Sequence, residues 1–164
     1  MNLPAFMDLE ASGFGGDSYP IEVGVALESG RTLCFLIKPS AHWTHWDDSA
    51  AATHGITREL LEKHGKSQRI IAETLNQELA GKTLYSDGWN HDYSWLHKLY
   101  EEAELYPNFK LESVLSLLDE QSMALWDEAK DKVIQIMNLQ RHRASSDALI
   151  LQNTYAAVSA LTVL

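Results

Sequence analysis

Residues 5–10, Ala-Phe-Met-Asp-Leu-Glu, begin as an apolar stretch and end with two acidic side chains. Residues i and i+2 of a β-strand point to the same face of a sheet. Asp8 and Glu10 therefore lie side by side if this stretch is a strand. Neighbouring carboxylates repel each other unless a cation neutralises them, and divalent ions prefer such oxygen ligands. A solvated strand end is the alternative interpretation.

The rest of the chain alternates between strand-like and helix-like patterns. We expect strands at 21–27, 31–37 and 83–86, and helices at 57–79, 92–106, from 146 onward and, as two stretches, across 111–139. The first three strands form a meander, and the fourth joins them through a crossover. We therefore expect an α/β chain with a mixed sheet and a single domain over 1–164.

The composition is that of an ordinary globular protein with an acidic surface. Hydrophobic residues make up 45% and charged residues 22%, which excludes a disordered chain. No apolar run is long enough to cross a bilayer, and the N-terminus does not resemble a signal peptide. A single cysteine, Cys34, cannot form an internal disulfide and is expected in the core. These features indicate a cytoplasmic protein without a membrane partner.

Two further acidic residues, Asp92 and Asp147, lie in the first turn of an expected helix. A carboxylate there stabilises the helix dipole by roughly 0.3–1 kcal/mol, which is a sufficient structural reason for it. Helical spacing, however, aligns each aspartate with the apolar face of its own helix. Because an inward carboxylate needs a partner, a shared metal ion is the functional interpretation.

His142 precedes Asp147 by five residues and is expected in the loop before the last helix. An imidazole titrates near neutral pH and is a natural general base for water beside a metal. A surface histidine is the alternative.

Four segments of the chain follow one another in a recognisable order. They are Met7-Asp8-Leu9-Glu10 with Gly13 and Ile21-Glu22-Val23-Gly24, then His54-Gly55-Ile56-Thr57, then Asp92-Tyr93-Ser94-Trp95-Leu96, then His142-x-Ala144-x-x-Asp147. Together they resemble the DEDDh exonucleases, the DnaQ-like branch of the RNase H-like fold. The chain departs from that pattern at Ala11 and Ser12, where threonines are common, and at Asp87-Gly88, where His-Asn is common.

The resemblance implies an RNase H-like fold, with a five-stranded mixed sheet flanked by helices and the carboxylates at one edge. It also implies two divalent cations, Mg²⁺ or Mn²⁺. Asp8, Glu10 and Asp147 would bind one, Asp8 would share the second, Asp92 would act partly through water, and His142 would be the base. Two ions ~3.5–4 Å apart can stabilise the attacking and leaving oxygens of a phosphoryl displacement.

The activity implied is that of a 3′–5′ exonuclease that releases nucleoside 5′-monophosphates from RNA or DNA. A phosphoesterase for a small nucleotide-like molecule and an inactive binding module are the alternatives. The net charge of −10 opposes a long duplex and favours a short or single-stranded partner. The oligomeric state stays open, with a homodimer among the alternatives.

Several residues are candidates for contact with the substrate. They are Ser12, Gly13, Phe14, His54, Trp43, Trp46 and Arg143. Indole rings in the segment 42–46 stack a terminal base in the functional interpretation, whereas in the other interpretation they pin a loop to the core. Arg143 is expected either to touch phosphate or to lie on the surface.

Overall fold

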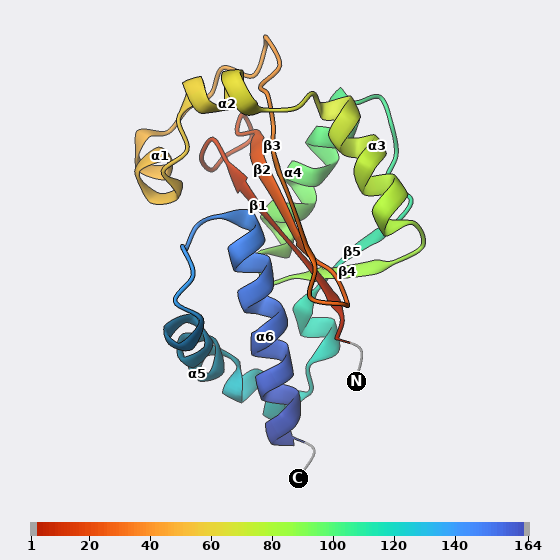
Figure 1. The fold of residues 1–164 in the computed structure, drawn as a ribbon, viewed down its shortest axis with the longest axis vertical. Helices are drawn as coiled ribbons and strands as arrows, with labels where there is room; N and C mark the ends of the chain where they lie inside the picture. Colours follow the sequence, from red (N-terminus) through yellow and green to blue (C-terminus); the bar gives the residue numbers. More distant parts are fainter. Residues whose placement is uncertain (1–2, 163–164) are drawn as a thin grey trace.

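The computed structural model describes residues 3–162 and contains one mixed sheet with helices on both faces (Figure 1). The five strands are β1 (Ala5–Ala11), β2 (Pro20–Ala26), β3 (Thr32–Leu36), β4 (Thr83–Ser86) and β5 (Lys110–Ser113). Their order in the sheet is β3-β2-β1-β4-β5. β1, β2 and β3 pair antiparallel, and β4 and β5 are parallel to β1. This confirms the predicted meander and crossover.

The helices form two layers around the sheet. They are α1 (Asp48–His54), α2 (Arg58–His64), α3 (Gln68–Leu79), α4 (Trp89–Glu102), the short 3₁₀ helix η1 (Val114–Leu117), α5 (Glu120–Met137) and α6 (Ala144–Thr162). α6 packs on β1 and β2 with α5 against its outer side, whereas α4 and α3 cover the other face (Figure 1). No helix within residues 3–162 is long and apolar enough to cross a membrane.

Side-chain alternation along β1 divides the interior into two cores. Ala5, Met7 and Leu9 are buried in the cluster on the α3 and α4 face. Phe6 is buried in the smaller cluster beneath α5 and α6. Because Asp8 and Glu10 continue the row that Phe6 begins, they face the side of the sheet on which α6 lies.

Three segments differ from the sequence prediction. The single helix expected at 57–79 is interrupted at 65–67, where the backbone of Lys66 bonds to Leu36 and Lys38 at the end of β3. Gly65 permits this approach, since a Cβ there would lie 2.5 Å from the Lys38 backbone nitrogen. Helix α1 was not predicted, and Cys34 is exposed on the edge strand β3 rather than in the core.

The strand β5 occupies the start of a stretch that was expected to be helical. It has four residues, of which only Leu111 is buried, so its sequence shows no clear alternation. Parallel pairing with β4, which the local sequence does not encode, defines it.

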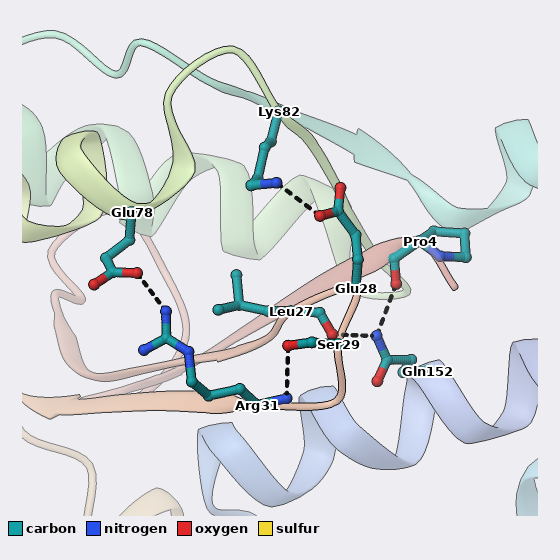
Figure 2. A network of polar contacts seen from close by, with 8 residues as sticks. All are labelled: Pro4, Leu27, Glu28, Ser29, Arg31, Glu78, Lys82 and Gln152. Carbon is teal, nitrogen blue, oxygen red and sulfur yellow. Dashed lines mark hydrogen bonds and ion pairs between the residues drawn. The ribbon is translucent and has the colours of Figure 1, made fainter. Parts of the chain in front are cut away.

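The end of the sheet nearest the N-terminus is held by paired polar groups (Figure 2). The Gln152 amide of α6 donates to the carbonyls of Pro4 and Leu27, at 2.9 and 2.8 Å. Two ion pairs beside it join the β2–β3 turn to its neighbours: Lys82 with Glu28 at 2.7 Å and Arg31 with Glu78 at 2.5 Å. We call this the hairpin-end network.

Candidate active site

The opposite end of β1 carries the acidic residues that the sequence singled out. In the sheet register Asp8 lies opposite Gly24 and Glu10 lies opposite Glu22 of β2. Pairing shifts between Glu10 and Ala11, so the strand is irregular directly after the second carboxylate. Asp8 and Glu10 therefore sit where regular pairing of the strand ends.

Asp92 reaches this strand end from the first turn of α4. Its side chain is only 3% exposed, and its Oδ1 accepts a hydrogen bond from the Leu9 backbone N–H at 3.2 Å. The Ser86 hydroxyl at the end of β4 donates to Oδ2. The carboxylate is thus aimed inward and held against β1 and β4, as the helical spacing predicted.

Asp147 and His142 come from the beginning of α6 and the loop before it. Asp147 Oδ2 accepts the His142 backbone N–H at 3.0 Å, and Oδ1 accepts Arg141 Nε at 2.8 Å. His142 has a φ of 58°, a left-handed conformation that is uncommon for a residue with a side chain. One potential ligand atom from each of Glu10, His142 and Asp147 lies within 4.8 Å of the others.

The start of α6 docks on β2 through Glu22 and Gly24. Glu22 is fully buried, and it accepts the Ala144 backbone N–H at 2.7 Å and Arg143 Nη2 at 2.6 Å. A Cβ at Gly24 would lie 2.1 Å from the backbone of Ala144. The segment 21–24 is therefore the docking surface for the helix that bears Asp147. Sequence reasoning quoted it as a motif but missed this role.

Burial of like charges raises the pKa values of three of these carboxyl groups. Burial is the largest cause in each. It raises the pKa of Glu10 to about 8, with a further contribution from Asp147. It raises the pKa of Asp92 to about 7, although the hydrogen bonds from Ser86 and Leu9 oppose the shift. The pKa of Asp8 is raised well above its ordinary value by burial and by Asp92 and Glu10.

Asp8 also carries an unsatisfied atom. Its Oδ2 is buried and has no hydrogen-bond partner among residues 3–162. A buried charged oxygen without a partner costs several kcal/mol unless it is protonated or binds a cation. A divalent cation fits this donor set, because all the available atoms are hard carboxylate oxygens and one imidazole.

Two cavities adjoin the carboxylates. The first, of about 260 Å³, is lined by Asp8, Glu10, Asp87, His91, Asp92, Lys130, Arg141, His142 and Asp147, among others. The second, of about 300 Å³, is lined by Gly13, Asp47, Thr53 and His54, among others. Both are bordered by Glu10, Phe14, Trp95 and His142.

Lys130 pairs with Asp87, and both residues line the first cavity. Its place on α5, far from the motifs, gave no signal in the sequence.

The predicted substrate contacts divide into two groups. Gly13, Phe14 and His54 line the second cavity. Phe14 is 67% exposed there, and its ring lies 5.1 Å from that of His91 and 6.1 Å from that of Trp95. The roles of these three residues in substrate binding remain predictions, and their place at the second cavity is compatible with such roles.

The other contacts require correction. Ser12 is buried, and its hydroxyl is bound to His45 Nδ1 at 2.9 Å and accepts the Tyr19 backbone N–H. Trp43 is 6% exposed and stacks on Tyr19, so the packing interpretation holds for it. Arg143 is bound to Glu22, and the cavity arginine is its neighbour Arg141.

Trp46 lies in a different place from the carboxylate cavities. It is partly buried against the core and lines a separate cavity, and the Arg58 guanidinium lies 5.5 Å from its ring centre.

The sheet order and the helices on its two faces define an RNase H-like fold. The chain is similar to solved structures of E. coli exonuclease I. The complex with a 5cy-dT13 oligonucleotide superposes with a TM-score of 0.75 at 12% identity, over 99% of this chain and 42% of that one. The complex with dA16 gives 0.72 at 12% identity, over 98% and 41%.

An exonuclease I from Methylocaldum szegediense is similar over a smaller region, with a TM-score of 0.57 at 13% identity, over 77% of this chain and 30% of that one. This chain thus spans about two fifths of the length of the E. coli protein. No protein-family model and no curated protein sequence matches it. At such identities the likeness establishes the fold.

Proposed function

We propose that the chain is a metal-dependent 3′–5′ exonuclease that removes nucleoside 5′-monophosphates from short or single-stranded nucleic acid. The observation that carries the proposal is Asp8 Oδ2, which is buried beside Glu10 and Asp92 and has no hydrogen-bond partner within residues 3–162. A purely structural role would not leave such an atom without a partner, whereas a metal ligand has this property in the ion-free protein.

Three carboxylates would hold the ions directly. Glu10 and Asp147 have ligand atoms close enough to share one cation, and Asp8 adds its free oxygen. Asp92, bound at both oxygens, would act through Asp8 or through water. When bound, two Mg²⁺ or Mn²⁺ ions would supply the charge that stabilises the attacking and leaving oxygens.

His142 would accept the proton of the attacking water. Its backbone is fixed by Asp147 Oδ2, and its side chain borders both cavities. A base must lie within hydrogen-bond reach of the proton that it takes, and this position beside the carboxylates meets that need.

The structural neighbours support the substrate class. E. coli exonuclease I has been solved with dA16 and dT13 oligonucleotides and, in a zinc-bound form, with single-stranded DNA. Over half of that protein has no counterpart in this chain.

The charge distribution supports a short substrate. The chain has 13 basic against 23 acidic residues, and Lys130 and Arg141 are the Lys and Arg residues that line the first cavity. Affinity for a long phosphate track depends on several basic contacts in a row. We therefore expect affinity to level off after a few nucleotides and to fall only gently with salt.

The test is digestion of 5′-labelled RNA and DNA, from a dinucleotide to a long single strand, with Mg²⁺, with Mn²⁺ and with EDTA. The proposal expects stepwise shortening from the 3′ end that stops in EDTA. Release that continues in EDTA contradicts it. Hydrolysis of a nucleoside phosphate alone would identify a small-molecule phosphoesterase, and no hydrolysis with intact cation binding would identify a binding module.

A further inference from the structure

Both oxygens of Asp147 are bound by neighbouring groups of the chain. Oδ2 accepts the His142 backbone N–H, and Oδ1 accepts Arg141 Nε at 2.8 Å. The side chain of Asp147 is 15% exposed and that of Arg141 is 35% exposed. A guanidinium thus occupies a carboxylate oxygen of the group that would hold a cation.

Arg141 and Arg143 are two residues apart, yet their partners differ in kind. Arg143 is bound to Glu22, a fully buried carboxylate that belongs to the docking surface of α6. Arg141 is bound to a residue of the candidate metal site and lines the first cavity. If Asp147 binds a cation, the ion pair between Arg141 and Asp147 would be broken, whereas the ion pair between Arg143 and Glu22 would remain.

We propose that Arg141 is a displaceable counter-ion of Asp147, which leaves Oδ1 when the site takes up a divalent cation and then binds the phosphate of the terminal nucleotide. This inference rests on the proposed function. The backbone bond from His142 to Oδ2 would keep Asp147 oriented while Oδ1 changes partner.

The chemistry of the guanidinium suits both positions. It is charged at all working pH values, and its planar fork binds a carboxylate or a phosphate through paired N–H donors. Bound to Asp147, it places a positive charge beside the carboxylate cluster. Once cations neutralise these carboxylates, the same positive charge is free beside the cavity where a phosphate would lie.

A first experiment follows Arg141 directly by NMR of the ¹⁵Nε–Hε groups during addition of Mg²⁺. The Arg141 signal is assigned by its loss in Arg141→Gln, and the Arg143 signal is the internal control. We expect the Arg141 signal to shift with cation occupancy while the Arg143 signal stays. An Arg141 signal that stays in place while calorimetry shows Mg²⁺ binding contradicts the inference and leaves the proposed function standing. An absence of Mg²⁺ and Mn²⁺ binding contradicts the proposed function itself.

A second experiment compares Arg141→Gln with Lys130→Gln. Both remove one positive charge from the same cavity, but Lys130 pairs with Asp87 rather than with Asp147. Loss of a competing ion pair is expected to tighten Mn²⁺ binding by roughly three- to ten-fold in Arg141→Gln. Lys130→Gln should change it by about two-fold or less. Equal tightening in the two variants would mean that only net charge matters, which contradicts displacement.

The phosphate part is tested with thymidine 5′-monophosphate as the probe. In the presence of Mn²⁺, we expect Arg141→Gln to bind it roughly ten-fold more weakly than the unchanged chain. Without a cation the two should bind it alike, since Arg141 is then held by Asp147. Equal affinity in the presence of Mn²⁺ would contradict a role in phosphate binding.

Discussion

The two ends of β1 differ in whether their charged side chains are paired. At the hairpin-end network, Lys82 meets Glu28, Arg31 meets Glu78, and the Gln152 amide satisfies two carbonyls (Figure 2). At the other end, Asp8 has an oxygen without a hydrogen-bond partner in the described part of the chain, and the neighbouring carboxyl groups of Glu10 and Asp92 have raised pKa values. The first end is arranged to stabilise the fold. At the second end, burial of these carboxylates costs stability, which protonation or a bound cation restores.

The largest effect is expected from Asp8→Asn, which keeps the shape of the side chain and removes its charge. Turnover should fall by about 10⁴-fold or more, because metal ligands contribute several kcal/mol to the transition state. The ion-free variant should melt at a higher temperature than the unchanged chain, since one buried charge is gone. Nucleotide release and calorimetric melting measure the two effects. Turnover of Asp8→Asn within ten-fold of normal would show that the unpaired carboxylate end of β1 is not a catalytic metal site.

His142→Ala should lower turnover by roughly 10²–10⁴-fold if the imidazole is the base. Mn²⁺ affinity, measured by calorimetry, separates the two roles that the position of His142 allows. We expect affinity within about three-fold of normal. A parallel collapse of affinity and turnover would make His142 a metal ligand instead, and Asp87 at the cavity rim would become the next candidate base.

The third prediction concerns pH and the ion-free fold. In the folded chain the pKa values of Glu10 and Asp92 lie above their ordinary values of 4.5 and 3.8. Between the ordinary and the raised pKa of each group, the folded chain therefore binds more protons than the unfolded chain. Their contribution to stability is present at low pH and is lost as pH rises through about 7 for Asp92 and about 8 for Glu10.

The melting temperature in EDTA should therefore fall as the pH rises from about 4 to about 8 and level off above that. Glu10→Gln should flatten this slope, and Mg²⁺ should reverse it. A slope that Glu10→Gln leaves unchanged would show that other groups are responsible.

The smallest effect is expected at the hairpin-end network. Lys82→Gln breaks the pair with Glu28, whose side chains are 32% and 44% exposed. Exposed pairs contribute about 0.2–1 kcal/mol, so the free energy of unfolding should change by no more than that. Turnover and Mn²⁺ affinity should be unaffected. A loss of turnover without a loss of stability would show that the two ends of β1 are coupled.

The sequence predicted most of the architecture because its strands β1 to β4 carry strong apolar patterns. It also predicted the inward direction of Asp92 and Asp147 from helical spacing. The family resemblance correctly implied a five-stranded sheet, but the apolar pattern did not locate β5, whose four residues are defined by pairing with β4. The pattern also did not predict the break at Gly65, which arises from contact with the end of β3.

The substrate contacts were harder to predict for a related reason. A residue type indicates what a side chain can bind but not which partner reaches it first. Ser12 is bound by His45, Trp43 by Tyr19 and Arg143 by Glu22, and each of these partners is distant along the chain. Arg141, two positions from Arg143, faces the cavity because the loop before α6 turns between them at His142.

The site joins β1, near one end of the chain, to the first turn of α6, near the other. This has a consequence for biosynthesis. A ribosome extends a chain by ~5–20 residues per second, so Asp8 leaves it on the order of ten seconds before Asp147 exists. A nascent or prematurely terminated chain that lacks α6 would have neither Asp147 nor His142. On the proposed function, the chain gains nuclease activity only after α6 has been synthesised and has packed on β1 and β2.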